Sequence, residues 1–170
     1  MAEFAYSITP ATDAGGPLRP GSDLVLSEST LSLRALRAAP SVLDTVLPFG
    51  HMHSTPTGMS LRHWPDMIWT TEADTPEGMA SVDIGHGWTC LHLRGLNALH
   101  FLADYLSADP FSEQAQASGS LRTTLGHYDC VLWWVGDQDV SLVVTRSYAQ
   151  SLVDFLRTLA VRNAQTAPAA

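Results

Sequence analysis

The amino-acid sequence predicts an α+β protein in which a β-sheet carries helices on one face, and three observations predict it. Two short apolar runs, residues 130–135 and 140–144, flank the polar, glycine-containing stretch 136–139, as in a β-hairpin. An amphipathic helix follows, which Ser147 can cap. Its apolar positions recur at helical spacing: Tyr148, Leu152, Phe155, Leu156 and Leu159. From residue 88 onward the order strand, helix, strand, strand, helix is close to a split βαβ unit of the ferredoxin-like type.

The N-terminal segment, residues 1–30, is rich in Pro, Gly, Ser and Thr, and breakers at 15–17 and 20–21 interrupt any regular element. We expect an extended arm with at most a short strand at 24–26, one that gains order against a partner and adds little to the core. A single α+β domain is then expected over 31–165, with a shortened first half (31–78) and a second half (79–165).

In the first half, residues 31–39 are compatible with a strand or a short helix. Ser41 is expected to cap a short helix that ends before Pro48. Residues 51–60 are interpreted as a polar loop, and residues 61–71 as a strand that Pro65 interrupts or places at an edge.

The second half is more regular. A strand is expected at 79–84, a turn at 85–87 and a strand at 88–94, together forming a hairpin. A helix over 96–106 follows, ended by Asp109-Pro110. The polar loop 107–120 is long for a compact domain, so we interpret it as a contact segment, and a further strand is expected at 121–125.

The composition excludes several classes of function. The chain has 170 residues and a net charge of −8, and all nine of its basic residues are arginine. Without a basic cluster, a nucleic-acid groove or an anionic membrane patch is not expected. The absence of lysine excludes Schiff-base catalysis and a phosphate-loop lysine in this chain.

Cellular location is inferred from the cysteines and from the N-terminal sequence. Cys90 and Cys130 lie in apolar strand-like runs and are most simply buried free thiols in a reducing compartment, with a disulfide as the alternative. The first residues lack the features of a signal peptide, and no apolar run approaches a membrane span. We therefore expect a cytoplasmic protein.

The sequence contains four candidate ligands for a metal site: His51, His53, His63 and Asp66. A His-x-His pair in a strand points both rings to one side, where they can bind one ion. However, this spacing matches no defined zinc motif, and prolines lie nearby. Surface histidines in a loop are the interpretation that we favour, and no metal is predicted.

Catalytic and cofactor signals are equally sparse. Both cysteines lie among apolar residues, which raise a thiol pKa, and Gly85-His86-Gly87 lacks the downstream glycine and helix of a dinucleotide site. We predict no catalytic and no cofactor-binding residue. Of the adjacent Trp133 and Trp134, one is expected in the core and one at an interface. The residues proposed for a partner interface are Trp134, Arg146, Tyr148 and Phe111.

The second half of the sequence, about residues 80–161, resembles the gamma subunit of heterotetrameric sarcosine oxidase, within the wider group of glycine-cleavage T-protein-like folds. The similar stretches are 82–89, 91–95, 130–136 and 142–149, followed by the helix that carries Leu152 and Phe155. Departures are Leu96 where that family favours proline, a partial match at 107–110, and a shorter first half.

The resemblance implies a non-catalytic accessory subunit of a complex that oxidatively demethylates sarcosine or a related N-methyl or secondary amine. It places FAD, FMN, NAD and tetrahydrofolate on larger flavoprotein partner subunits and zinc on another small subunit. The Lys-Gly-Cys motif of folate-binding relatives is absent. The alternative is a small stand-alone folate- or pterin-binding protein of the same fold, with Trp88 or Trp134 as the stacking platform.

Overall fold

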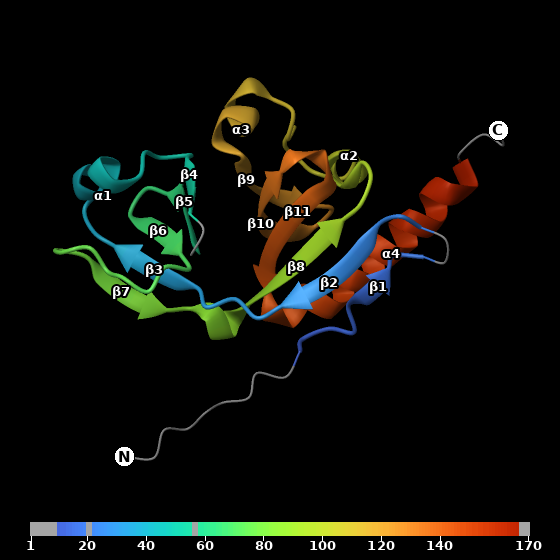
Figure 1. Ribbon diagram of the computed structural model, residues 1–170, viewed down its shortest axis with the longest axis horizontal. Helices are drawn as coiled ribbons and strands as arrows, with labels where there is room; N and C mark the ends of the chain where they lie inside the picture. The colour runs from blue at the N-terminus through green and yellow to red at the C-terminus, as the bar shows by residue number, and fades with distance from the viewer. Residues whose placement is uncertain (1–9, 20–21, 56–57, 167–170) are drawn as a thin grey trace, which may run out of the picture.

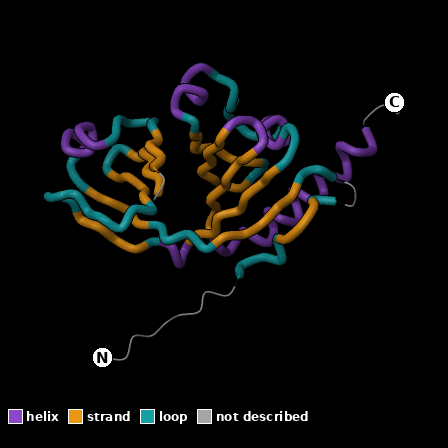
Figure 2. Tube along the Cα trace, in the orientation of Figure 1, coloured by secondary structure: helices purple, strands orange, loops and turns teal. Residues whose placement is uncertain are grey.

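The computed structural model describes residues 10–19, 22–55 and 58–166. Its strands form two antiparallel sheets, which Figure 1 shows as separate groups of arrows and Figure 2 as separate groups of orange segments. The helices lie on the outer sides of these sheets or at their ends. This arrangement confirms the predicted α+β class.

The larger sheet has six strands in the order β1-β2-β8-β11-β10-β9, and every neighbouring pair is antiparallel. Since β8 and β10 both pair antiparallel with β11, they run parallel to each other on either side of it, as in a split βαβ unit. The bounds are β1 Gly15–Pro17, β2 Val25–Ser29, β8 Trp88–Arg94, β9 Ser120–Leu125, β10 Tyr128–Val135 and β11 Asp139–Thr145.

The smaller sheet has five strands in the order β4-β5-β6-β3-β7 and is built from the first half of the chain. Its strands are β3 Arg34–Arg37, β4 Met52–Thr55, β5 Gly58–Trp64, β6 Met67–Thr70 and β7 Ala80–Asp83. The helices are α1 Pro40–Val46, α2 Ala98–Ala103, α3 Glu113–Ser118 and α4 Ala149–Thr166. The 3-10 turns are η1 Gly85–Gly87, η2 Gly136–Gln138 and η3 Arg146–Tyr148.

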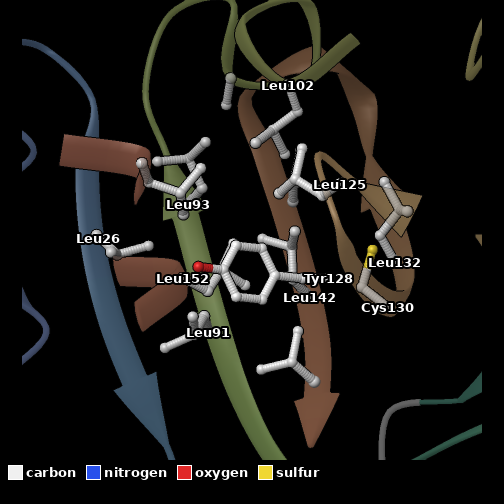
Figure 3. Packing of buried hydrophobic residues seen from close by; sticks show 14 of the residues in the cluster. Leu26, Leu91, Leu93, Leu102, Leu125, Tyr128, Cys130, Leu132, Leu142 and Leu152 are labelled. Carbon is white, nitrogen blue, oxygen red and sulfur yellow. The ribbon is translucent and has the colours of Figure 1, made fainter. Parts of the chain in front are cut away.

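One face of the larger sheet packs against α2 and α4. Leu91 and Leu142 point from the sheet into this core and meet Leu102 of α2 and Leu152 of α4 (Figure 3). All four side chains are fully buried. Because alternate residues of a strand face opposite sides, the strands supply this core from every second position.

The other face of the larger sheet packs against the smaller sheet. Cys90, Val131 and Val143 of the larger sheet share a second core with Leu61 and Trp69 of the smaller one. Helix α1 covers the outer face of the smaller sheet with Leu43 and Leu47. The order of layers is therefore α2 and α4, larger sheet, smaller sheet, α1.

The side chain of Arg62 in β5 holds α1 onto the smaller sheet. It is only 2 % exposed. Its guanidinium donates to the carboxylate of Asp44, 2.5 Å away, and to the carbonyls of Leu47 and Pro65 at 2.9 and 3.0 Å. These partners offset the cost of burying a charge.

Several predicted elements are confirmed. The hairpin of β10 and β11 pairs residue 130 with 144 and 135 with 139, around the predicted polar turn. Helix α4 buries Leu152, Leu156 and Leu159, although Tyr148 lies before the helix and is exposed. Residues 34–37 take the strand alternative, and a strand at 120–125 is present as expected.

The predicted arm is wrong for the part that the structure describes. Residues 25–29 form β2 between β1 and β8, and both Leu18 and Leu26 are buried. The carboxylate of Glu28 accepts hydrogen bonds from the backbone amides of residues 11 and 12. Asp13 pairs with Arg157 of α4 at 2.9 Å. The domain therefore includes residues before 31, because β8 offers its free edge to this segment.

Four further expectations are corrected. Helix α1 begins at Pro40, so Ser41 lies inside its first turn and does not cap it. Residues 52–55 and 58–60 are strand, not loop, because β4 and β5 pair with each other. Residues 85–87 are not a hairpin turn, since β7 and β8 belong to different sheets and η1 connects them. Within 107–120 the chain forms α3, whose first turn is capped by the Ser112 hydroxyl.

The turn from β8 into α2 depends on Gly95. Its φ is +135°, and a Cβ at this position would lie 2.2 Å from the carbonyl oxygen of Asp23. Only glycine combines this backbone with so close an approach. The close approach of Gly95 to Asp23 and Leu24 places the segment between β1 and β2 directly beside the end of β8.

Candidate functional site

Three tryptophans gather where the two sheets meet. Trp64 of β5 stacks on Trp69 of β6, with ring centroids 4.3 Å apart. Trp88, at the start of β8, meets Trp69 edge-on at 4.6 Å. Trp69 is 2 % exposed, whereas Trp64 and Trp88 are half-buried. The antiparallel pairing of β5 with β6 places Trp64 beside Trp69, and the packing of the two sheets brings Trp88 to them.

Beside these rings lies a cleft of about 220 Å³, which we name the tryptophan cleft. Its wall includes all three indole rings and Met67, and its mouth carries Arg122 of β9 and Asp129 of β10. The guanidinium carbon of Arg122 lies 4.9 Å from the centre of the Trp64 ring, within the range of a cation–π contact. The cleft therefore combines an aromatic wall with one positive and one negative side chain.

His92 forms a polar cluster with two serines on the face of the larger sheet that points away from α2 and α4. Its Nε2 lies 2.7 Å from the Ser29 hydroxyl, and its Nδ1 lies 2.9 Å from the Ser141 hydroxyl. Burial, together with the charge of Arg94, lowers the pKa of His92 below its ordinary value, so the ring is neutral at pH 7. A neutral imidazole donates to one hydroxyl and accepts from the other. A serine occupies the position where a catalytic triad has an orienting carboxylate.

Both cysteines are free and buried, which confirms the prediction of buried free thiols. Burial raises the pKa of Cys90 and that of Cys130 to about 12. Asp129 adds to the effect at Cys130, because its negative charge disfavours a thiolate. At neutral pH neither thiol supplies the thiolate that nucleophilic chemistry requires.

The histidines considered for a metal site are separated in the fold. His51 and His53 are exposed, whereas His63 is half-buried with its Nε2 3.1 Å from the Ser120 hydroxyl. Asp66 lies in the turn between β5 and β6, 4.0 Å from Arg37. In the described ranges, no three His, Cys, Asp or Glu side chains come together as a metal-binding group. The expectation of no metal stays a prediction.

His63 has an unusual electrostatic environment. Burial lowers its pKa to about 4, and the positive charge of Arg122 contributes in the same direction. The ring is therefore neutral down to mildly acidic pH. It faces a second cleft, of about 280 Å³, between β5 and α3, and Arg122 lines both this cleft and the tryptophan cleft.

The prediction that Trp134 lies at a partner interface is wrong. Trp134 is 7 % exposed and packs in the core beneath α2 and α4, so it offers little surface to a partner. Its neighbour Trp133 points to the opposite face and is half-buried. The alternation of the two rings was predictable, but the face covered by helices depends on long-range packing.

The other predicted interface residues lie at the surface in two separate places. Tyr148 of η3 is 58 % exposed, and beside it the half-buried Arg146 lines a cavity of about 70 Å³. Phe111 is 39 % exposed and contacts His100 of α2 at 4.5 Å between ring centres. Helix α2 contacts η2, at the start of β11, whereas η3 follows the end of that strand. These residues therefore do not form one patch.

Comparison with known proteins gives a likeness of fold. No sequence-family profile matches the chain, and no curated protein sequence matches it at a significant level. The fold is similar to that of a chain in the structure of heterotetrameric sarcosine oxidase from Corynebacterium sp. U-96 in complex with pyrrole 2-carboxylate, with a TM-score of 0.69. The two chains are 18% identical, and the match covers 86% of this chain and 88% of the other. The fold is thus related to that of a subunit in a multi-subunit enzyme.

None of the helices in the described ranges is long and apolar enough to cross a membrane.

Proposed function

We propose that this chain is a non-catalytic, gamma-like accessory subunit of a multi-subunit flavin-dependent oxidase or dehydrogenase that oxidatively demethylates sarcosine or a related secondary amine. The observation that carries the proposal is the shared fold with a chain of heterotetrameric sarcosine oxidase, which extends over 86% of this chain and 88% of that one. A match over nearly all of both chains favours a corresponding subunit over a shared fragment.

The chemistry of the interior supports a role without catalysis. The two thiols have pKa values of about 12, and His92 is held between two serine hydroxyls. In the proposed complex the chemistry takes place on the larger flavoprotein subunits, which hold FAD, FMN, NAD and tetrahydrofolate. This chain holds no cofactor. The complex works in the cytoplasm, where its buried thiols stay reduced.

The surface supports a role in assembly. Large apolar side chains are exposed on separate parts of the molecule, among them Phe49 at 57 %, Val135 at 76 % and Tyr148 at 58 %. Aromatic residues are enriched at interfaces, and a net charge of −8 favours a partner patch that is rich in Arg or Lys. A permanent complex of this kind buries more than about 2,000 Å² in total.

The alternative of a folate- or pterin-binding protein receives little support. Trp134 is buried in the core and has no free face for stacking. Trp88 does line a cleft, but the volume of about 220 Å³ is below the roughly 300–1,000 Å³ of sites for drug-sized ligands. A folate would have to lie largely outside it.

Purification of the isolated full-length chain tests the non-catalytic role. The expected preparation has no flavin absorbance and does not oxidise sarcosine or other N-methyl amino acids, with or without added FAD and tetrahydrofolate. Turnover of any of these substrates by the isolated chain would contradict the proposal. Recombinant monomeric sarcosine oxidase serves as the positive control for the assay.

A further inference from the structure

Two opposite charges at the mouth of the tryptophan cleft have no ionic partner in the described parts of the chain. The ion pairs there involve other residues, and neither Arg122 nor Asp129 takes part in one. Arg122 lies opposite Val131, and Asp129 lies opposite Thr124, so the two charged side chains are diagonal neighbours on one face of the β9–β10 pair. Their backbones are therefore about 7–8 Å apart.

An unsatisfied donor lies in the wall of the same cleft. Trp69 is 2 % exposed, and its indole Nε1 has no hydrogen-bond partner among the described residues. A buried N–H without a partner is unfavourable, because it has lost its hydrogen bond to water. The nitrogen itself has almost no solvent-accessible surface, so this donor is not available to a ligand in the cleft.

The polar groups and the aromatic wall complement different parts of one ligand. A guanidinium binds a carboxylate through two parallel hydrogen bonds, which makes Arg122 a suitable partner for an anion. The face of a tryptophan attracts ammonium cations, and alkylated ammonium groups are the ligands that aromatic cages recognise. The carboxylate of Asp129 attracts the same cation.

We propose that the tryptophan cleft binds a small zwitterion that carries a carboxylate and an alkylated ammonium group. Arg122 binds the carboxylate, whereas Asp129 and the ring of Trp88 hold the ammonium group. A purely cationic or purely anionic ligand would leave one of the two charges at the mouth without a partner. The volume of about 220 Å³ limits the ligand to the size of a small amino acid.

This site belongs to the isolated chain, because both sheets that form it come from the same polypeptide. Its test needs no partner subunit, so its outcome is separate from that of the proposed accessory role. The observation behind it is also different, since it rests on the geometry of residues from β5, β6, β8, β9 and β10 and not on a likeness to another protein.

Isothermal titration calorimetry of the full-length chain tests the site with three probes. Glycine betaine carries both charges, choline carries the same trimethylammonium group without the carboxylate, and acetate carries only the carboxylate. Glycine betaine should bind at least about tenfold more tightly than either single-charge probe, which corresponds to about 1.4 kcal/mol. Its binding should also change the intrinsic tryptophan fluorescence.

Matched variants separate the site from a general effect of charge. Arg122→Gln and Asp129→Asn should each weaken betaine binding at least about tenfold. Arg94→Gln and Asp137→Asn make the same charge changes at exposed positions away from the cleft and should leave it unchanged within about twofold. Thermal unfolding of each variant verifies that it is folded.

Three results would overturn the site. They are absence of betaine binding by the wild-type chain, equal affinity for betaine and for choline or acetate, and unchanged affinity in Asp129→Asn. Because the side chain of Asp129 is exposed and makes no hydrogen bond or ion pair within the described ranges, this variant is expected to fold like the wild type.

Discussion

Replacement of Leu156 by alanine tests how helix α4 is anchored to the larger sheet. Leu156 is fully buried in the core between them. The substitution removes three carbon atoms, which at about 0.8 kcal/mol per methylene amounts to about 2.4 kcal/mol of lost burial. A residual cavity of about 50 Å³ would add about 1.2 kcal/mol, at about 24 cal/mol per Å³. The free energy of unfolding should therefore fall by about 3–4 kcal/mol.

Equilibrium urea unfolding, followed by far-UV circular dichroism, measures this loss. In thermal unfolding followed by the same signal, the unfolding temperature should fall by about 6–16 °C, since 1 kcal/mol corresponds to about 2–4 °C in a domain of this size. Val161→Ala is the control, because Val161 is on the same helix but 46 % exposed, and its effect should stay within about 0.5 kcal/mol. A loss below about 1 kcal/mol for Leu156→Ala would show that this face of α4 is not packed as described.

Three further predictions follow from burial and ionisation. Deletion of residues 1–22 should lower the free energy of unfolding by at least about 2 kcal/mol in the same urea assay, because it removes β1 and the buried Leu18; an unchanged value would show that this segment does not belong to the core. Cys90 and Cys130, with pKa values of about 12, should react with a thiol reagent at neutral pH only after unfolding, so rapid labelling of the native chain would be contrary to their burial. His63, whose pKa falls from 6.5 to about 4, stays neutral in the folded chain while the unfolded chain takes up a proton, so stability should decrease as pH falls from 6.5 towards 4. His63→Gln should flatten this part of the pH profile, and an unaltered profile would assign the pH dependence to other groups.

Elements with a local signal were predictable from the sequence. The β10–β11 hairpin has a polar turn at 136–139 between two apolar runs, and α4 has apolar residues at helical spacing. In both, the residues that interact are neighbours along the chain. Periodicity therefore contains most of the information that determines these elements.

Elements that depend on distant partners were not predictable. Strand β2 pairs Val25 with Arg94 and Ser29 with Cys90, so its stability comes from a strand more than sixty residues away. Strand β4 has the polar sequence Met-His-Ser-Thr and forms at a sheet edge, where solvent-facing side chains are tolerated. Local composition favours a loop for β4 and at most a short strand at 24–26 for β2, and pairing with the neighbouring strand decides the outcome.

Only part of the candidate site could be predicted from the sequence. Among its residues, Trp88 was identified from the sequence as a possible stacking platform. Trp64, Trp69, Arg122 and Asp129 carried no signal, because they lie on separate strands of two sheets. A single residue cannot indicate a cleft that forms only when the sheets pack together. The face that Trp134 occupies was undetermined for the same reason, since it depends on where the helices cover the sheet.

Co-expression with flavoprotein subunits from the same organism is the most direct test of the proposed accessory role. Size-exclusion chromatography with light scattering gives the mass of the purified assembly, and its absorbance reports flavin. We expect one stable complex that contains this chain, carries flavin on the large subunits and dissociates only under denaturing conditions, as a permanent interface above about 2,000 Å² implies. A folded chain that elutes as a monomer, separate from an assembled and active flavoprotein, would contradict the accessory-subunit role.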